Sequence, residues 1–176
     1  MMIRPVEASD VAAIAAIYRH HVLHGSASFE TEPPAVEEMD NRRTSLAGGG
    51  YPYLVAADAD EVLGYAYAGP YRARAAYRNT VENSIYLRPA AAGRGLGGTL
   101  LAALIAAAEA RGFRQMVAVV GDSANTASIK LHERHGFQRV GVLRSVGYKH
   151  GRWLDSVLLQ RALGAGDEAK PSAPDE

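Results

Sequence analysis

Apolar and polar residues alternate in several short segments of this chain, and longer segments between them repeat their apolar residues with a helical period. The alternating segments predict strands at residues 3–6, 53–57, 62–68, 80–87, 116–120, 137–144 and 154–159. The helical period predicts helices at residues 9–23, 35–46, 99–111 and 125–134. Ser9 is expected to cap the first helix, because serine is a favoured residue at that position and Asp10 suits the first turn.

A strand, a glycine-rich turn and a helix form the central unit of the chain. In the strand, Val81, Asn83, Ile85 and Leu87 alternate with Thr80, Glu82, Ser84 and Tyr86. In the helix, one face carries only apolar residues: Leu100, Leu101, Leu104, Ile105 and Ala108. Gly112 supplies the left-handed residue that commonly ends a helix. We therefore expect the glycine-rich turn to be held between a strand and a helix.

Four glycines, Gly93, Gly95, Gly97 and Gly98, lie in this turn. A glycine turn that leads into the free N–H groups of a helix is suited to bind an anion, most often phosphate. The alternative is an ordinary tight connection. Although Gly93-x-Gly95-x-x-Gly98 matches the dinucleotide fingerprint, residues 88–92 separate the strand from the first glycine and three predicted strands precede it. No Gly-Lys-Ser or Gly-Lys-Thr follows, which excludes the mononucleotide loop.

Composition narrows the class of protein. The 176 residues are 48% hydrophobic and 22% charged, as expected for one globular domain with a substantial core. Lys plus Arg and Asp plus Glu number 19 each, so the net charge favours neither nucleic acid nor an anionic membrane. No apolar run approaches the ~20 residues of a membrane span, and the first residues lack a signal-peptide core. The absence of cysteine excludes disulfides and thiol chemistry. We expect a cytoplasmic domain at residues 1–163 and a disordered tail at residues 164–176.

Glu82 is a candidate general base, because a carboxylate in a central strand is an unfavourable placement unless it has a task. The alternative is a structural glutamate paired with a nearby arginine. Arg72 and Arg74 would project to the same side of an extended segment and could grip a carboxylate, or they could belong to a solvated loop. His20 and His24 lie one turn apart but lack a third ligand, so no metal site is predicted.

The order of elements and two motifs resemble the GNAT acetyltransferases. Ala92-Gly93-Arg94-Gly95-Leu96-Gly97 resembles their pyrophosphate loop, although Ala92 replaces the usual Gln or Arg. Asn125-x-x-Ser128 followed by Leu131-His132-Glu133-Arg134-His135-Gly136-Phe137 resembles their second motif, where a helix lies against coenzyme A. Three further segments resemble the phosphinothricin and methionine sulfoximine N-acetyltransferase branch: Gly69-Pro-Tyr-Arg-Ala-Arg-Ala-Ala-Tyr77, Thr80-Val-Glu82 and Gly147-Tyr-Lys-His-Gly-Arg-Trp-Leu-Asp155.

The resemblance implies an α/β (α+β) fold with a central, mixed and mostly antiparallel sheet flanked by helices. It also implies a homodimer that uses acetyl-CoA and a small amino-acid substrate. The expected cofactor-binding residues are Ile85, Tyr86, Leu87, Gly93, Arg94, Gly95, Leu96, Gly97, Gly98, Asn125 and Ser128, and the expected substrate-binding residues are Arg72, Arg74 and Glu82. The resemblance to this branch implies that Glu82 is the general base. At His132 the resemblance is equally compatible with proton donation and with substrate contact. The alternative is a histidine with a purely structural role.

The base is required because an α-amine with a pKa of about 7.7–8.0 is largely protonated at pH 7 and attacks a thioester only after losing a proton. A backbone N–H near Leu87 could stabilise the resulting oxyanion. Three functions remain: an amino-acid-analogue N-acetyltransferase, another GNAT activity such as protein N-terminal acetylation, or a coenzyme-binding module without catalysis. Glu82 argues against the third, and the paired arginines argue against the second.

Overall fold

The computed structural model describes residues 1–59 and 61–171. Its elements are β1 (Met2–Pro5), α1 (Val11–His24), α2 (Val36–Gly48), β2 (Tyr53–Asp58), β3 (Glu61–Pro70), β4 (Thr80–Leu87), α3 (Leu96–Ala110), β5 (Gln115–Gly121), α4 (Thr126–Arg134), β6 (Gln138–Lys149) and β7 (Arg152–Ala162). Short 3-10 turns lie at η1 (Ala8–Asp10), η2 (Ala75–Tyr77) and η3 (Pro89–Ala91). All predicted strands and helices are present close to their predicted bounds, except that β6 and β7 are longer.

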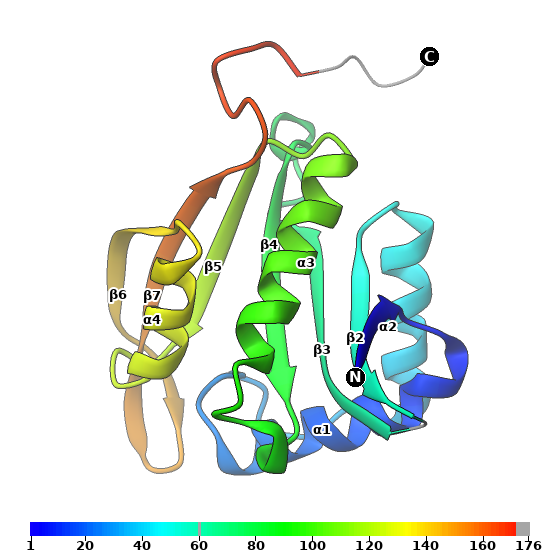
Figure 1. The fold of residues 1–176 in the computed structure, drawn as a ribbon. Coiled ribbons are helices and arrows are strands. Elements are labelled where there is room, and N and C mark those ends of the chain that lie inside the picture. The colour runs from blue at the N-terminus through cyan, green and yellow to red at the C-terminus, as the bar shows by residue number, and fades with distance from the viewer. Residues whose placement is uncertain (60, 172–176) are drawn as a thin grey trace.

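The strands form one seven-stranded sheet in the order β1-β2-β3-β4-β5-β7-β6 (Figure 1). Only β4 and β5 pair in parallel, which confirms the prediction of a mixed, mostly antiparallel sheet. Their pairing begins at Thr80 with Gln115 and stops at Asn83 with Ala118, although both strands continue. The two strands therefore diverge toward their C-terminal ends, as Figure 1 shows.

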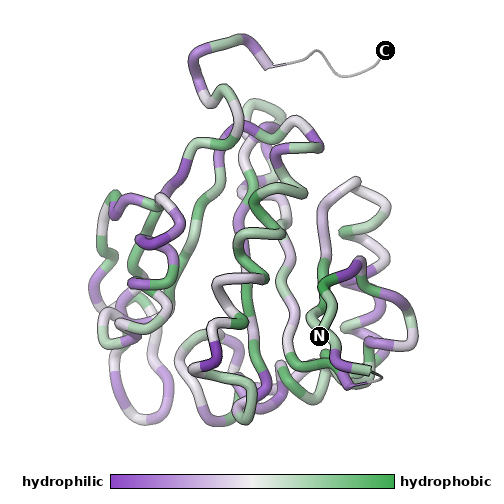
Figure 2. Tube along the Cα trace, viewed as in Figure 1, coloured by the Kyte–Doolittle hydropathy of each residue, from purple (hydrophilic) through white to green (hydrophobic). Residues whose placement is uncertain are grey.

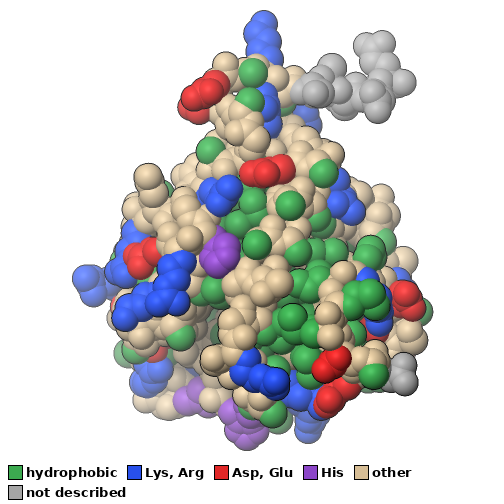
Figure 3. Space-filling model, viewed as in Figure 1, with side chains coloured by type: hydrophobic (Ala, Val, Ile, Leu, Met, Phe, Trp, Pro, Cys, Tyr) green, Lys and Arg blue, Asp and Glu red, His purple; other side chains and the backbone are tan. Residues whose placement is uncertain are grey.

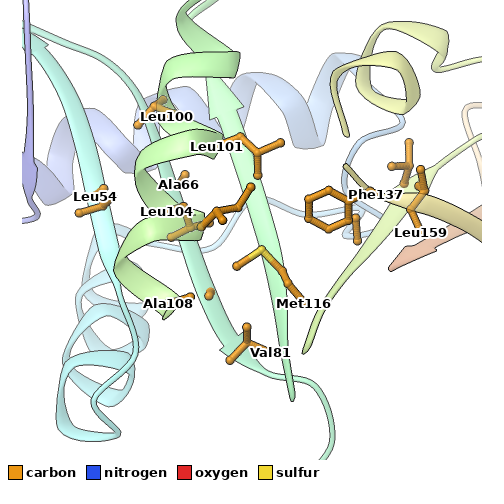
Figure 4. Packing of buried hydrophobic residues seen from close by; sticks show 14 of the residues in the cluster. Leu54, Ala66, Val81, Leu100, Leu101, Leu104, Ala108, Met116, Phe137 and Leu159 are labelled. Atoms are coloured by element: carbon orange, nitrogen blue, oxygen red, sulfur yellow. The ribbon is translucent and has the colours of Figure 1, made fainter. Parts of the chain in front are cut away.

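Helices cover both faces of the sheet and bury two hydrophobic clusters. The larger cluster lies under α3, where Leu100, Leu101 and Leu104 are fully buried against strand residues such as Ala66 and Met116 (Figure 4). Figure 2 shows that α3 is hydrophobic along most of its length. Each buried leucine contributes about 1.5–3 kcal/mol relative to an exposed one. The predicted helical face of α3 is thus confirmed, and it fixes the glycine turn at the start of the helix.

The second cluster lies on the opposite face, under α1 and α2. Ile14 and Val22 of α1 and Met39 of α2 pack against Val55 and Tyr65 of the sheet. The two faces follow from the alternation of side chains along each strand. In β4, even-numbered side chains consequently face α1 and α2, and odd-numbered ones face α3 and α4.

The predicted cap at Ser9 is wrong. Ser9 lies inside η1, and Asp10 instead accepts a hydrogen bond from the backbone N–H of Glu7 at 2.8 Å in a capping box. The guanidinium of Arg4 donates two bonds of 2.7 and 2.8 Å to the same carboxylate. A buried carboxylate with three donors is a stronger anchor than a serine hydroxyl, and the N-cap is Glu7, two residues before the predicted cap at Ser9.

The predicted extent of β6 and β7 is too short for a different reason. In β6 nearly every side chain is exposed, and the register against β7 shifts between Arg139 and Gly141 and again between Leu143 and Gly147. These irregularities break the alternation of apolar residues that reveals a strand in the sequence, whereas the backbone ladder continues to the turn at His150 and Gly151.

The segment after β7 folds back on the domain as far as it is described. Gly166 and Glu168 donate backbone hydrogen bonds to Leu163 and Ala165, and Arg114 donates to the carbonyl of Ala169 at 2.6 Å. The remainder of the predicted tail, residues 172–176, lies outside the described residues. Across residues 1–59 and 61–171, we find no helix with the length and apolar character needed to cross a membrane.

Candidate active site

A cleft opens where β4 and β5 separate. Its volume is about 450 Å3, and it is lined by the diverging ends of both strands, α1, the start of α3 and the helix α4. We call it the strand cleft. Asn83 and His132 line this cleft. Six of the predicted cofactor-binding residues line it as well: Ile85, Tyr86, Leu87, Gly97, Asn125 and Ser128.

Backbone donors of β4 point into the strand cleft. Hydrogen bonds from Tyr71 N–H to the carbonyl of Thr80 (3.3 Å) and from Arg88 N–H to that of Leu63 (2.9 Å) mark the β3–β4 ladder, so even-numbered residues of β4 bond to β3. The N–H groups of Ile85 and Leu87 therefore face the side from which β5 has departed. The carbonyl of Leu87 accepts a bond from His21 Nε2 at 2.8 Å. Burial lowers the pKa of His21, so this ring donates as a neutral imidazole.

The glycine turn has two structural tasks. Gly93 and Gly95 adopt φ of +75° and +79°, and a Cβ at either position would meet no atom of the chain within 4 Å. Gly97 and Gly98 instead allow α3 to approach α4: a Cβ at Gly98 would lie 3.3 Å from His135. Because the first N–H groups of a helix have no acceptor within it, those of Leu96 and Gly97 remain available beside open space. This geometry suits an anionic group.

Helix α4 begins beside the same cleft. Asn125 caps it by accepting a bond from Ser128 N–H at 3.3 Å. Exposed basic residues, Lys130 and Arg134, follow on α4, and Figure 3 shows Lys and Arg side chains gathered over this helix. The predicted site residue Arg94 is also exposed and lies in the glycine turn. Positive charge thus flanks the end of the strand cleft where the free N–H groups lie.

His132 is held inside the protein by both ring nitrogens. Nδ1 lies 2.8 Å from the carbonyl oxygen of Ser128, and Nε2 lies 3.0 Å from Oδ1 of Asn83. The ring is 4% exposed and meets Phe137 edge to face. Burial lowers the pKa of His132, and the hydrogen bond to Ser128 offsets only part of this decrease. A proton-donating role stays a prediction, and this geometry gives a structural role direct support.

Glu82 lies on the opposite face of β4 and lines two cavities. One, of about 530 Å3, is lined by Tyr18, Tyr53, Tyr65, Tyr67 and residues of α2; we call it the tyrosine cavity. The other, of about 240 Å3, includes Phe29 and Gly121; we call it the bridging cavity. Ser84 lines the tyrosine cavity, the bridging cavity and the strand cleft, so the three are contiguous at β4. Glu82, two residues before Ser84 on the same strand, lines two of these three cavities.

The environment of Glu82 favours a base rather than a structural ion pair. Within the described residues Glu82 forms no salt bridge. Burial raises its pKa, and the charge of Arg72 only partly offsets this rise. A carboxylate with a raised pKa is better matched to proton transfer near neutral pH than one paired with a guanidinium.

Arg72 and Arg74 lie in the exposed segment between β3 and β4. Arg72 stacks over the ring of Tyr71 at 5.1 Å, and Arg74 immediately precedes the turn η2. Neither arginine is among the residues that line the tyrosine cavity or the bridging cavity. The charge of Arg72 nevertheless reaches Glu82. The structure thus brings Arg72 close to the candidate base without placing either arginine inside the cavities.

The loop at residues 25–35 was missed by the sequence analysis as part of the site. Lys149 donates to the carbonyl of Ser28 at 2.7 Å, and Tyr18 shares a 2.8 Å hydrogen bond with the Ser28 hydroxyl. Glu30 accepts two bonds from Arg42 of α2, at 2.8 and 3.3 Å. These contacts hold the loop over the bridging cavity from three sides.

Two glycines within strands indicate in the sequence that another segment lies close to them. A Cβ at Gly121 would lie 2.1 Å from the carbonyl oxygen of Ser26, and a Cβ at Gly147 would lie 2.5 Å from the ring of Phe29. An isolated glycine in a strand often marks a close approach of another segment. The sequence did not indicate which segment approaches. As for metals, the described ranges contain no cluster of three His, Cys, Asp or Glu side chains that could hold an ion.

Known proteins match nearly the whole chain. A profile described as the acetyltransferase (GNAT) domain matches residues 3–158. The phosphinothricin N-acetyltransferase of Alcaligenes faecalis is 53% identical over 169 residues, which cover 96% of this chain and 86% of that protein. An L-methionine sulfoximine/L-methionine sulfone acetyltransferase of Pseudomonas aeruginosa is 43% identical over 162 residues, covering 92% and 94%. A crystal structure of the phosphinothricin acetyltransferase from Sinorhizobium meliloti with acetyl-CoA has a TM-score of 0.95 and 47% identity, covering 97% and 92%.

Proposed function

Because the chain belongs to the GNAT family of acetyltransferases, we propose that it moves the acetyl group of acetyl-CoA to the α-amine of a small amino-acid analogue. The family, its fold and the use of acetyl-CoA as co-substrate were predicted from the motifs and are confirmed. The proposed acceptors are of the phosphinothricin, methionine sulfoximine or methionine sulfone type, on which relatives with 53% and 43% identity act according to their names.

The proposed site for acetyl-CoA is the strand cleft together with the glycine turn next to it. Open space beside Gly93 and Gly95 adjoins the free N–H groups at the start of α3, which suit a pyrophosphate. The free N–H of Ile85 on the open edge of β4 can donate to an amide carbonyl of an extended arm. When bound, acetyl-CoA supplies the thioester that the amine attacks. We expect the activity in the cytoplasm, where acetyl-CoA is available.

Glu82 carries the proposal, because its carboxylate, which forms no salt bridge within the described residues, lines two cavities that share Ser84 with the strand cleft. In our mechanism Glu82 accepts a proton from the substrate ammonium, directly or through water, and the free amine then attacks the thioester carbon. The N–H of Leu87 donates to the carbonyl oxygen as negative charge develops there. The tetrahedral intermediate then collapses with cleavage of the C–S bond, and the attacking nitrogen loses its extra proton to water. The thiolate that leaves must gain a proton. Both nitrogens of His132 already have partners, so we assign this proton to solvent.

The acceptor is identified by a substrate screen with acetyl-CoA. Release of free thiol should be measured with phosphinothricin, methionine sulfoximine, methionine sulfone, the ordinary amino acids and a peptide with a free N-terminus. We expect turnover with one of the three analogues at least tenfold above that with the peptide. Turnover confined to the peptide would establish the protein N-terminal activity instead. Binding of acetyl-CoA without turnover on any amine would establish a non-catalytic coenzyme-binding module.

We also propose that the protein is a homodimer. The outward residues of β6 and β7 form an apolar surface, with exposures from 41% at Val142 to 64% at Trp153, and it includes Leu143, Val146 and Tyr148. Large exposed apolar side chains on one strand pair, two of which, Tyr148 and Trp153, contact each other, favour an interface. Sedimentation of the wild type should give twice the mass of the chain, and Trp153→Glu should shift it toward the monomer. A monomeric wild type would contradict the proposal.

A further inference from the structure

Asn83 lies at the point where the sheet opens. It is the last residue of β4 that pairs with β5, opposite Ala118, and its side chain is 6% exposed. This side chain reaches two partners: the carbonyl of Val117 on β5 at 3.4 Å, and Nε2 of His132 on α4 at 3.0 Å. A single buried amide thus lies between both strands of the cleft and the helix that forms its wall.

The protons on this contact can be assigned from the partners. A backbone carbonyl can only accept, so the 2.8 Å contact between Nδ1 of His132 and Ser128 requires a proton on Nδ1. A neutral ring then has a lone pair on Nε2, which needs a donor. The only donor on Asn83 is its amide NH2, and a half-turn of the amide group exchanges its oxygen and nitrogen in place. The long contact to Val117 is the weaker of the two and is the one given up.

The charged ring is the alternative, since it could donate from both nitrogens. Within the described residues no carboxylate acts on His132; the titratable neighbour is His135, which directly follows α4 and whose charge would oppose a second positive charge. The other contacts, with Phe137 and Asn83, are uncharged. A buried imidazolium without a counterion is unfavourable. The environment therefore favours the neutral ring.

We propose that Asn83 is a positioning residue: its amide NH2 donates to Nε2 of a neutral His132, and this bond fixes α4 against β4 at the mouth of the strand cleft. Ser128, whose carbonyl receives the other ring nitrogen, lines the same cleft. Since both nitrogens are occupied, His132 supports cofactor binding and does not donate a proton to the departing thiol. The inference rests on the proposed site for acetyl-CoA but not on the identity of the acceptor.

Nitrogen NMR of the imidazole groups in the full chain tests the proton assignment. His132 should show a protonated Nδ1 and an unprotonated Nε2 at pH 7 and above. His132→Gln identifies its signals by their loss, and His135→Gln identifies those of its neighbour. In Asn83→Asp the new side chain is a carboxylate that cannot donate, so Nε2 should take up a proton and the titration of His132 should move upward by about one to three pH units. A wild-type ring protonated on both nitrogens at pH 7, or on Nε2 alone, overturns the proposal.

Calorimetric titration with acetyl-CoA tests the consequence for the cleft without any acceptor. Asn83→Leu should weaken binding about tenfold, His132→Leu should do the same, and the double variant should be no weaker than either single one, since each removes the same contact. With an active acceptor, KM for acetyl-CoA should rise in Asn83→Leu while kcat changes less than threefold. A fall in kcat with unchanged acetyl-CoA affinity would make His132 a proton donor and overturn the proposal. If Asn83→Leu does not fold, the wild-type NMR spectrum still decides.

Discussion

Glu82 and Asn83 are neighbours on β4, yet their side chains lie on opposite faces of the sheet. Glu82 lines the tyrosine cavity and the bridging cavity, whereas Asn83 lines the strand cleft and contacts His132. The alternation of side chains along a strand is sufficient to produce this separation. In the proposed mechanism, the acceptor chemistry then lies on one face and support of the cofactor on the other, at the residue where β4 and β5 part.

Replacing Glu82 with Gln should lower kcat because shape is kept and basicity is lost. We expect a loss of about 10²–10⁴-fold at pH 7, with acetyl-CoA binding unchanged. The loss should shrink as pH rises toward the pKa of the substrate amine, about 7.7–8.0, because solution then supplies free amine. Measurement of kcat against pH for both proteins checks this. Glu82→Asp, which keeps the charge, should retain more activity than Glu82→Gln.

The wild-type profile should also rise through the pKa of Glu82, which burial raises above its ordinary value. Below that pKa the carboxyl is protonated and cannot accept the amine proton, so activity is lost on the acid side. A folded Glu82→Gln protein with full activity at pH 7 would remove Glu82 from the mechanism. A variant that only loses thermal stability would make it a structural residue.

Gly95→Val should abolish acetyl-CoA binding. The φ of +79° is unfavourable for a β-branched residue, and a side chain would occupy the open space beside the turn. Gly112→Val is a matched control, because Gly112 has φ of +81°, equally open surroundings and a place beyond the other end of α3. Both variants should lose similar stability, and calorimetry should show lost binding only for Gly95→Val. Equal acetyl-CoA affinity in the two variants would make the turn a simple connection.

Local patterns predicted most of the fold, and distant contacts account for what they missed. The faces of β4 and α3 follow from periodicity, as does the stop at Gly112. The bond between Lys149 and Ser28 joins positions 121 residues apart, and that between His132 and Asn83 joins positions 49 apart. No local pattern encodes such pairs. Sequence alone also could not show that Glu82 lacks an ion-pair partner, since three arginines lie nearby in the chain.

Arg72→Ala and Arg74→Ala should weaken the binding of the acidic end of the acceptor. Each is expected to lower kcat/KM about tenfold to a hundredfold through KM for the amino acid, with KM for acetyl-CoA nearly unchanged. Arg78→Ala in the same exposed segment controls for the general loss of positive charge and should change kcat/KM less than threefold. If acetyl-CoA affinity falls instead, these arginines bind the cofactor. Equal effects of all three variants would indicate nonspecific attraction.

Lys149→Met should loosen the loop at residues 25–35. The change keeps an apolar side chain but removes the hydrogen-bond donor to the carbonyl of Ser28. In the wild type, burial lowers the pKa of Lys149, and the charge of Glu30 opposes this shift. An unsatisfied buried carbonyl costs about 1–3 kcal/mol. We expect a lower melting temperature and a higher KM for the acceptor, with unchanged acetyl-CoA affinity. Lys130→Met on the exposed face of α4 should leave the melting temperature and the acceptor KM unchanged. An acceptor KM that does not move in Lys149→Met would separate the loop from the acceptor site.

Asp10→Asn should destabilise the protein in a manner that depends on pH. The hydrogen bond from Arg4 lowers the pKa of Asp10 below its ordinary value, so the folded protein binds this proton more weakly than the unfolded chain. The stabilisation is therefore complete above the ordinary pKa of about 3.9 and is lost as pH falls through the lower folded pKa. We expect a difference of roughly 1.5–3 kcal/mol in unfolding free energy near pH 7, shrinking below about pH 4. Urea titrations of both proteins from pH 7 to pH 3 measure it.

Asp40→Asn, at an exposed i,i+3 pair with Arg43, should cost at most about 1 kcal/mol. A difference between wild type and Asp10→Asn that stays constant down to pH 3 would show that the charge of Asp10 does not stabilise the start of α1.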